Sequence, residues 1–201
     1  MSVLGCIFAG GKGERLGGQD KALLELEGTP FWQIVSDRLR PMVNGGCVTG
    51  HMDPEWRAQI DDFEFVRDCK VDGDAIGPAG GLLAALEWGL EFAGPEARLL
   101  TVPVDAPFFS ENLFDHLNEG VGTAPAALAT TAHQLQPTFG LWTCHLAALV
   151  RGCVEADDFA LHVIAKKAGA AFVHFDDENR SFMNINTPND LRLAQKISGG
   201  N

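Results

Sequence analysis

Short apolar runs mark the strands in the first half of the chain. Residues 3–9 contain only apolar residues and one glycine, and such a run is typical of a strand buried on both faces of a parallel sheet. The apolar-rich runs at 47–49 and 63–66 predict a second and a third strand. The run at 99–104 predicts a fourth, which ends at Asp105-Ala106-Pro107.

Residues with helical periodicity lie between these runs. One predicted helix ends at Pro41, and its apolar face is formed by Phe31, Ile34, Val35 and Leu39. A stretch at 77–81 opens a second helix, with an apolar face of Leu82, Leu83, Leu86 and Leu90. A third helix is predicted over 111–117. Strands and helices in this order indicate an α/β fold, a Rossmann-like, open and mostly parallel twisted sheet with helices on both faces.

The second half of the chain is less regular. Strands are predicted at 126–130, 138–142, 171–175 and 182–184. Leu161, Ile164, Ala165 and Ala168 mark a helix, and Pro188 opens a C-terminal helix at its first turn. The sequence has no repeat, low-complexity tract or shift in composition, so we expect one domain over residues 1–201.

Length and charge narrow the classes of function. A chain of 201 residues with 46% hydrophobic residues buries roughly 70% of its unfolded surface without disulfides. It has 15 Lys and Arg against 27 Asp and Glu, a formal net charge of −12, and no basic run. That balance disfavours nucleic acid as a partner. An anionic ligand must therefore be bound by a few local cations and backbone N–H groups.

No segment is long enough to suggest a membrane partner. The apolar run at 3–9 is far shorter than the roughly 20 residues of a membrane span, and it lacks the basic segment that begins a signal peptide. The cysteines are five in number and scattered, without a C-x-x-C motif. We therefore expect reduced thiols and a cytoplasmic location.

A glycine-rich loop follows the first strand. Residues 10–21 hold five glycines together with Lys12, Arg15 and Lys21. Glycines allow backbone N–H groups to approach a phosphate chain, and the carboxyl end of a strand is where open α/β sheets bind ligands. A flexible turn would not need so many glycines and cations together, so the loop predicts anion binding.

Two better-known glycine motifs fit this loop poorly. A Walker loop requires G-x-x-x-x-G-K-[ST], and residues 10–18 contain no Gly-Lys-Ser or Gly-Lys-Thr. A dinucleotide fingerprint requires G-x-G-x-x-G, and Leu16 stands where its third glycine belongs. The sequence also has no zinc-type histidine spacing and no G-x-S-x-G elbow.

Two acidic residues end predicted strands. Asp105 is expected at the same sheet edge as the glycine loop, and Mg²⁺ favours one or two carboxylates with phosphate oxygens; a helix cap is an equally good interpretation. Asp68 could accept hydrogen bonds from a base or a ribose, or merely cap a loop. In the turn at 184–188, Thr187 is expected as an N-cap, while Asn184 and Asn186 could direct oxygens into the site.

Together these motifs resemble those of the molybdenum cofactor guanylyltransferases, within the broader nucleotidyltransferases that share a G-G-x-x-x-R-[ML]-G-x-x-K loop. The resemblance extends nearly from end to end and implies a nucleotide-diphospho-sugar transferase-like fold. The segments that carry it are the loop at 9–21, Gly77-Pro78-Ala79-Gly80-Gly81, Val104-Asp105-Ala106-Pro107-Phe108, Gln136-Pro137-Thr138-Phe139-Gly140-Leu141 and Asn184-Ile185-Asn186-Thr187-Pro188-Asn189-Asp190-Leu191.

The resemblance implies that GMP is transferred from GTP to molybdopterin, with release of pyrophosphate. It also implies Mg²⁺ as cofactor and contact with proteins that mature molybdoenzymes. Nucleotide binding is thereby assigned to Phe8, Ala9, Gly10, Gly11, Lys21, His51, Asp68 and Asp105. Catalysis is assigned to Arg15, Lys21 and Asp105, the metal to Asp105, and the pterin side to Asn184 and Asn186.

The predicted chemistry needs no protein nucleophile, because the acceptor phosphate itself attacks. It needs no strong general base either, because that phosphate is already ionised at pH 7. Positioning and electrostatic stabilisation should supply the catalysis. Three alternatives stay open at this point. They are a related transferase with another base or acceptor, such as a molybdopterin cytidylyltransferase or a sugar-1-phosphate enzyme; a catalytically silent adaptor that binds nucleotide; and a Rossmann-type oxidoreductase.

Overall fold

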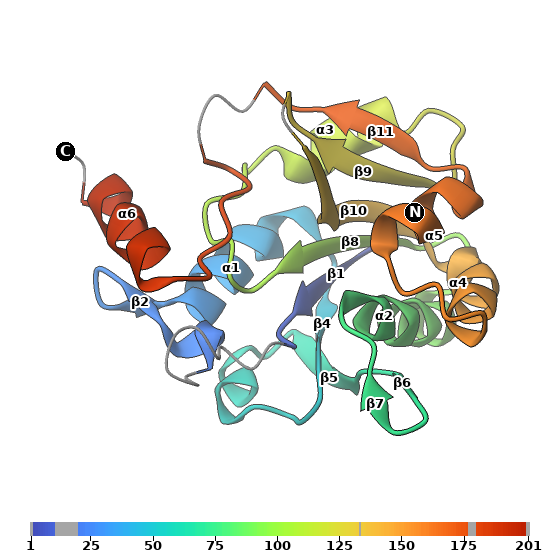
Figure 1. Ribbon diagram of the computed structural model, residues 1–201, viewed down its shortest axis with the longest axis horizontal. Coiled ribbons are helices and arrows are strands. Elements are labelled where there is room, and N and C mark those ends of the chain that lie inside the picture. The colour runs from blue at the N-terminus through green and yellow to red at the C-terminus, as the bar shows by residue number, and fades with distance from the viewer. Residues whose placement is uncertain (1, 11–19, 133, 177–179, 200–201) are drawn as a thin grey trace.

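A seven-stranded sheet forms the centre of the protein. The computed structural model describes residues 2–10, 20–132, 134–176 and 180–199. The strand order is β11-β9-β10-β8-β1-β4-β5 (Figure 1). All neighbouring pairs are parallel except those of β10, which is antiparallel to β8 and β9. The strands are β1 Val3–Phe8, β4 Gly46–Gly50, β5 Phe63–Arg67, β8 Arg98–Pro103, β9 Ala126–Thr130, β10 Leu135–Thr143 and β11 Ala171–His174.

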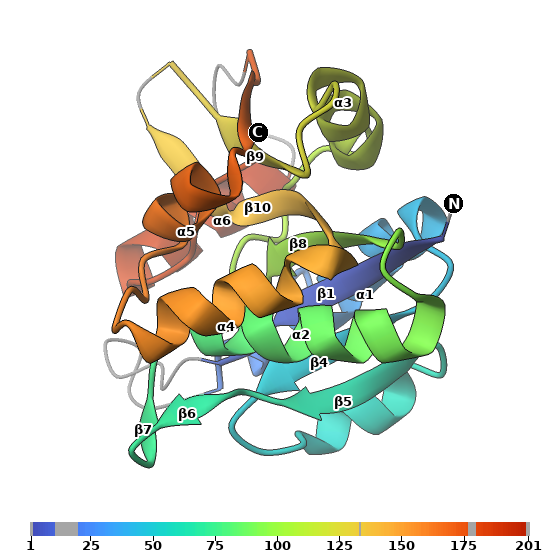
Figure 2. The same ribbon diagram turned by 90° about the vertical axis from the view of Figure 1, so that its right-hand side faces the viewer.

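Helices cover both faces of this sheet. They are α1 Phe31–Leu39, α2 Pro78–Ala93, α3 Leu113–Gly120, α4 Ala147–Glu155, α5 Leu161–Ala168 and α6 Pro188–Ser198. Alternate residues of β1 enter separate cores: Leu4 and Cys6 pack with α2, α4 and α5, whereas Ile7 packs with α1 and α3. Helices α2 and α4 lie side by side on their face (Figure 2). The predicted α/β class with a mostly parallel sheet is confirmed.

Short hairpins and 3₁₀ turns lie outside the central sheet. Two hairpins are formed by β2 Glu25–Leu26 with β3 Thr29–Pro30 and by β6 Lys70–Val71 with β7 Asp74–Ala75. Short 3₁₀ turns occupy Lys21–Leu23, Arg40–Met42, Glu55–Gln59 and Cys144–Leu146. Helix α6 contacts β2, and a third small core joins them. No helix in the described residues is both long and apolar enough to cross a membrane.

One predicted strand is wrong. Residues 182–184 pair with no strand in the described part of the chain. Phe182 instead packs edge-on against Phe139 and Phe175, with ring centroids 4.9 and 5.1 Å away. Phe182 is therefore buried within an irregular segment and not within a strand, because a ring can be buried without a hydrogen-bonded ladder. Helix α4 was not predicted, and α3 begins at Leu113 rather than at residue 111.

Candidate functional site

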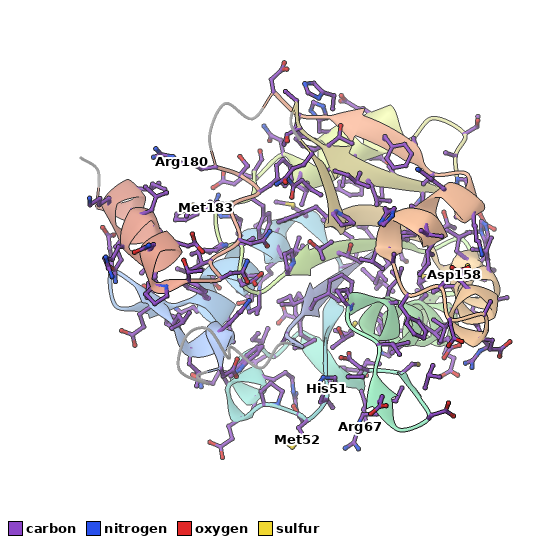
Figure 3. All side chains as sticks on the ribbon, in the orientation of Figure 1. His51, Met52, Arg67, Asp158, Arg180 and Met183 are labelled. Atoms are coloured by element: carbon purple, nitrogen blue, oxygen red, sulfur yellow. The ribbon has the colours of Figure 1, made fainter. Side chains whose placement is uncertain are left out.

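The carboxyl ends of four parallel strands bring the predicted site residues to one edge of the sheet. Ala9 and Gly10 follow β1, and Asp105 follows β8. His51 follows β4, and Asp68 follows β5, whose last residue is Arg67 (Figure 3). Open α/β sheets bind ligands at this edge, as the sequence predicts.

A cavity of about 270 Å³ opens at this edge. Its walls come from segments far apart in the sequence, which supply Phe8, Ala9, Gly10, Lys21, Pro78, Pro103, Val104, Asp105, Gln136, Pro137, Thr138, Asn184 and Asn186. A polar rim on largely apolar walls is the usual build of a small-molecule site. Seven of the residues proposed from the sequence thus line one cavity: Phe8, Ala9, Gly10, Lys21, Asp105, Asn184 and Asn186.

The Lys21 ammonium connects the polar side chains at the rim of the cavity. Its Nζ lies 2.6 Å from Oδ2 of Asp105, and it also donates a hydrogen bond to Oδ1 of Asn186. The Lys21 and Asp105 side chains are 18% and 16% exposed, so this ion pair is largely shielded from bulk water. One cation is thereby held between two acceptor oxygens from segments far apart in the sequence.

Local contacts explain why Lys21 points into the cavity. It begins a 3₁₀ turn capped by Asp20, whose Oδ1 accepts a hydrogen bond from Ala22 N at 3.0 Å. Oδ2 of the same carboxylate accepts from Trp56 Nε1 at 3.0 Å. Trp56 is in turn stacked on Trp32 of α1, with ring centroids 5.8 Å apart. Both oxygens of one carboxylate therefore fix the turn that carries Lys21.

The segment before α6 is fixed to the same strand end. Ile185 N donates to the carbonyl oxygen of Asp105 at 2.8 Å. Thr187 caps α6 through a capping box with Asp190, as expected for this turn. Asp190 also accepts from Asn186 N at 3.1 Å. The backbone that carries Asn186 is thus held against Asp105.

Asp68 and His51 do not line the cavity, but Asp68 lies next to Gly10, which does. The Asp68 side chain is buried, and its Oδ2 is 3.7 Å from His51 Nδ1. Neither Asp68 Oδ1 nor His51 Nδ1 has a hydrogen-bond partner in the described residues. Burial raises the pKa of the Asp68 carboxyl, and His51 and the Thr49 hydroxyl offset part of this rise. A buried acid with a free oxygen is suited to accept hydrogen bonds from a ligand.

Glycine gives access to Asp68. A Cβ on Gly10 would lie 3.0 Å from Oδ2 of Asp68, and a Cβ on Gly81 would lie 2.7 Å from Thr49 Oγ1. Side chains at these two positions would crowd the carboxylate. Gly11 and Arg15, which the sequence also assigns to the site, lie outside the described residues.

The oxygen donors fit a hard divalent cation. No group of three or more His, Cys, Asp or Glu side chains among the described residues could hold a metal by itself. Asp105 and Asn186 nevertheless already direct oxygens at one positive charge, the Lys21 ammonium. Mg²⁺ is commonly bound by one or two carboxylates together with substrate phosphates and water, and this donor set matches that pattern.

Sequence reasoning assigned no role to the residues of β10 that line the cavity. Gln136 belongs only to a segment that carries the resemblance, and Thr138 is predicted only as the first residue of a strand. The available signal was Gln136-Pro137 directly before the strand predicted at 138–142, because a proline next to or inside a strand indicates a break in the ladder. Pro103, at the end of β8, was likewise not assigned to the site.

Comparison with known proteins agrees with this geometry. Residues 5–170 match the family model described as the MobA-like NTP transferase domain. The chain belongs to this family. The resemblance found in the sequence is thereby confirmed, and the protein is a nucleotidyltransferase rather than an oxidoreductase.

Relatives and solved structures support the same assignment. A molybdenum cofactor guanylyltransferase from Cereibacter sphaeroides is 36% identical over 98% of this chain and 97% of its own length. One from Serratia proteamaculans is 32% identical over 98% and 96% of the two chains. The structure of molybdopterin-guanine dinucleotide biosynthesis protein A from Archaeoglobus fulgidus shares the fold, with a TM-score of 0.72, 22% identity and 99% coverage of both chains.

Proposed function

We propose that the protein transfers GMP from GTP to molybdopterin, releasing pyrophosphate and forming a guanine dinucleotide of the cofactor. The main structural support is that Lys21, Asp105 and Asn186 meet at the rim of one cavity. The similarity to molybdenum cofactor guanylyltransferases over nearly the whole chain supports GTP and molybdopterin as the substrates.

The nucleotide is proposed to bind across the ends of β1, β4 and β5. Phe8, Ala9 and Gly10 would contact the base and ribose, since they form the cavity wall next to Asp68. The free Oδ1 of Asp68 is an acceptor, and guanine presents N–H donors on the edge that distinguishes it. His51 lies beside this carboxylate and would contact the same end of the nucleotide. Gly11 and Arg15 are proposed to wrap the triphosphate.

The reaction forms a bond from an acceptor phosphate oxygen to the α-phosphorus of GTP. The bond from the α-phosphorus to its bridging oxygen breaks, and pyrophosphate leaves with that electron pair. Lys21 would offset negative charge at the α-phosphorus and the departing pyrophosphate, together with Arg15.

Asp105, with Asn186 beside it, would hold Mg²⁺. When bound, the ion acts as a Lewis acid on phosphate oxygens. Asn184 and Asn186 are proposed to face the pterin side.

The proposed reaction takes place in the cytoplasm. All five cysteines are free, as is usual for chains in a reducing compartment. Proteins that mature molybdoenzymes are the proposed recipients of the product.

Pyrophosphate release tests the proposal. Purified protein with Mg²⁺ is given GTP or CTP, each with and without molybdopterin. We expect release only with GTP and molybdopterin together. Release with CTP in preference to GTP would assign the protein to another base, and release with neither would contradict the transfer reaction.

A further inference from the structure

The order of the strands divides the cavity into two halves. Strand β8 lies between β1 and β10 in the sheet, and Asp105 follows β8. Phe8 to Gly10 form the wall on the β1 side, whereas Gln136 to Thr138 form the wall on the β10 side. Because the proposed nucleotide site lies over β1, β4 and β5, the acceptor must approach Asp105 over β10. This assignment rests on the proposed function.

A wide bulge shapes the acceptor side. Gln136 is paired with Ala129 of β9, and Gly140 is paired with the adjacent residue Leu128. Residues 137–139 are therefore extra and leave the ladder. Pro137 has no N–H to donate to a neighbouring strand, which favours a bulge at this position. A bulge re-aims side chains, and such features recur beside active sites.

The hydroxyl of Thr101 fixes this bulge. Thr101 is fully buried in β8. Its Oγ1 accepts a hydrogen bond from Gly140 N at 3.1 Å. The same hydroxyl lies 3.0 Å from the carbonyl oxygen of Thr138, to which it donates. One buried side chain thus bonds a backbone donor at Gly140, where the ladder resumes, and a backbone acceptor within the bulge.

Gln136 is the polar group that the bulge presents to the cavity. The residue is only 5% exposed. Its amide forms no side-chain hydrogen bond within the part of the chain that the structure describes. The amide atoms of Gln136 are not among the fully buried polar atoms that lack a partner, so they remain accessible from the cavity that Gln136 lines. Its amide therefore has unused donor and acceptor capacity facing the acceptor half.

We propose that Gln136 determines acceptor specificity and that Thr101 positions it. A glutamine amide places a donor beside an acceptor in one plane. It is complementary to a planar heterocycle that carries an N–H next to a ring nitrogen or carbonyl, as a pterin does. A sugar ring offers hydroxyl groups but no such planar edge. Gln136 thereby selects for a pterin, while Lys21 and Asp105 act on the phosphates.

Substitution of Gln136 tests the specificity role. Gln136→Leu removes both hydrogen-bonding groups at similar volume, and Gln134→Leu makes the same change at an exposed position two residues earlier. The Kd for molybdopterin, measured without GTP, should rise roughly 10- to 100-fold in Gln136→Leu. The Kd for GTP with Mg²⁺ should stay unchanged, and Gln134→Leu should match wild type in both. An unchanged molybdopterin Kd, or a loss confined to GTP, would overturn the role of Gln136.

Substitution of Thr101 tests the positioning role. Thr143 is a matched control, because it is also buried and its hydroxyl donates to the carbonyl oxygen of Pro125 at 2.8 Å, away from the cavity. Thr101→Val should raise the KM for molybdopterin about fivefold or more, because each lost hydrogen bond leaves a buried backbone group unpaired. The KM for GTP should be unaffected. Thr101→Ser should restore the KM for molybdopterin. Thr143→Val should lower Tm and leave the KM for molybdopterin unchanged. Equal acceptor KM values for Thr101→Val and Thr143→Val would contradict positioning by Thr101.

The wild-type protein separates this inference from the proposed function. Molybdopterin binding without transfer of GMP would contradict the proposed reaction, and the Kd values of the Gln136 variants would still decide its role. Absence of molybdopterin binding would contradict both the proposed acceptor and the pterin specificity assigned to Gln136.

Discussion

The Lys21 ammonium is paired with the Asp105 carboxylate at 2.6 Å, across 84 residues of sequence. In the free protein this pair places a lysine charge at the carboxylate that the proposed reaction uses for Mg²⁺. A divalent ion and an ammonium compete for the same oxygen, since like charges repel. Triphosphate oxygens would attract Lys21 away from Asp105, so nucleotide and metal should bind together.

Metal binding in the absence of nucleotide tests this competition. Lys21→Met removes the positive charge and keeps much of the apolar stem. We expect Mn²⁺, measured by electron paramagnetic resonance, to bind the free Lys21→Met protein more tightly than wild type. Lys70→Met, at an exposed lysine of β6, should have no effect. Weaker or equal Mn²⁺ binding by Lys21→Met would show that the pair does not occlude the metal position.

Loss of the Asp105 charge should abolish most turnover. Asp105→Asn keeps the side-chain shape and the backbone carbonyl that accepts from Ile185 N. Removal of a preorganised electrostatic group typically costs about 10²–10³ in kcat, and we expect a loss of that size. Circular dichroism and Tm should stay close to wild type. Mg²⁺-dependent activity near the wild-type level would exclude Asp105 as the metal ligand.

The buried Asp68 carboxylate should lower the stability of the fold at pH 7 and strengthen nucleotide binding. Burial raises the pKa of its carboxyl, so the folded state binds a proton more tightly than the unfolded state. The contribution of Asp68 to stability is therefore greatest at low pH and is lost as the pH rises from the unfolded to the folded pKa. Asp68→Asn should raise the urea midpoint at pH 7.

The same substitution should weaken GTP binding roughly tenfold or more, because a buried acceptor of the base is lost. For the wild type, GTP affinity should fall as the pH drops through the raised pKa of Asp68, because the neutral acid is a poorer acceptor. Calorimetric titration with GTP at several pH values measures this. Equal GTP affinity in Asp68→Asn and wild type would place the base elsewhere.

Asp20 should support both stability and the position of Lys21. Its carboxylate accepts from Ala22 N and from Trp56 Nε1, so Asp20→Ala leaves two donors without their acceptor. We expect a loss of about 1–2 kcal/mol in the free energy of unfolding by urea, together with a lower kcat. Asp20→Asn retains an acceptor oxygen and should recover most of both. Full activity in Asp20→Ala would mean that Lys21 does not depend on this cap.

The sequence was sufficient to predict the sheet and the meeting of Lys21 with Asp105. Strand β1 was recognisable because its residues are buried on both faces, a pattern that surface segments do not show. Lys21 and Asp105 could be placed together because each follows a parallel strand, and the carboxyl ends of such strands share one edge.

Features that depend on tertiary contacts were not predictable. The bulge at 137–139 is fixed by Thr101 on another strand, and nothing local identifies that partner. Phe182 is buried because it completes an aromatic cluster, and a buried apolar residue of this kind is also what a strand would show. The pairing of Asp68 with His51 joins the ends of two strands, so their separation could be read only from the fold.

The most direct test of the central claim follows the label of α-³²P-GTP. The protein is incubated with this nucleotide, Mg²⁺ and molybdopterin, and the products are separated. The account predicts that label moves to a molybdopterin guanine dinucleotide, with one pyrophosphate released for each GMP transferred, and that Lys21→Met and Asp105→Asn lose this transfer. The account would be contradicted if the label stayed in GTP with the wild-type protein and an intact acceptor. It would also be contradicted if both variants transferred as much label as the wild type.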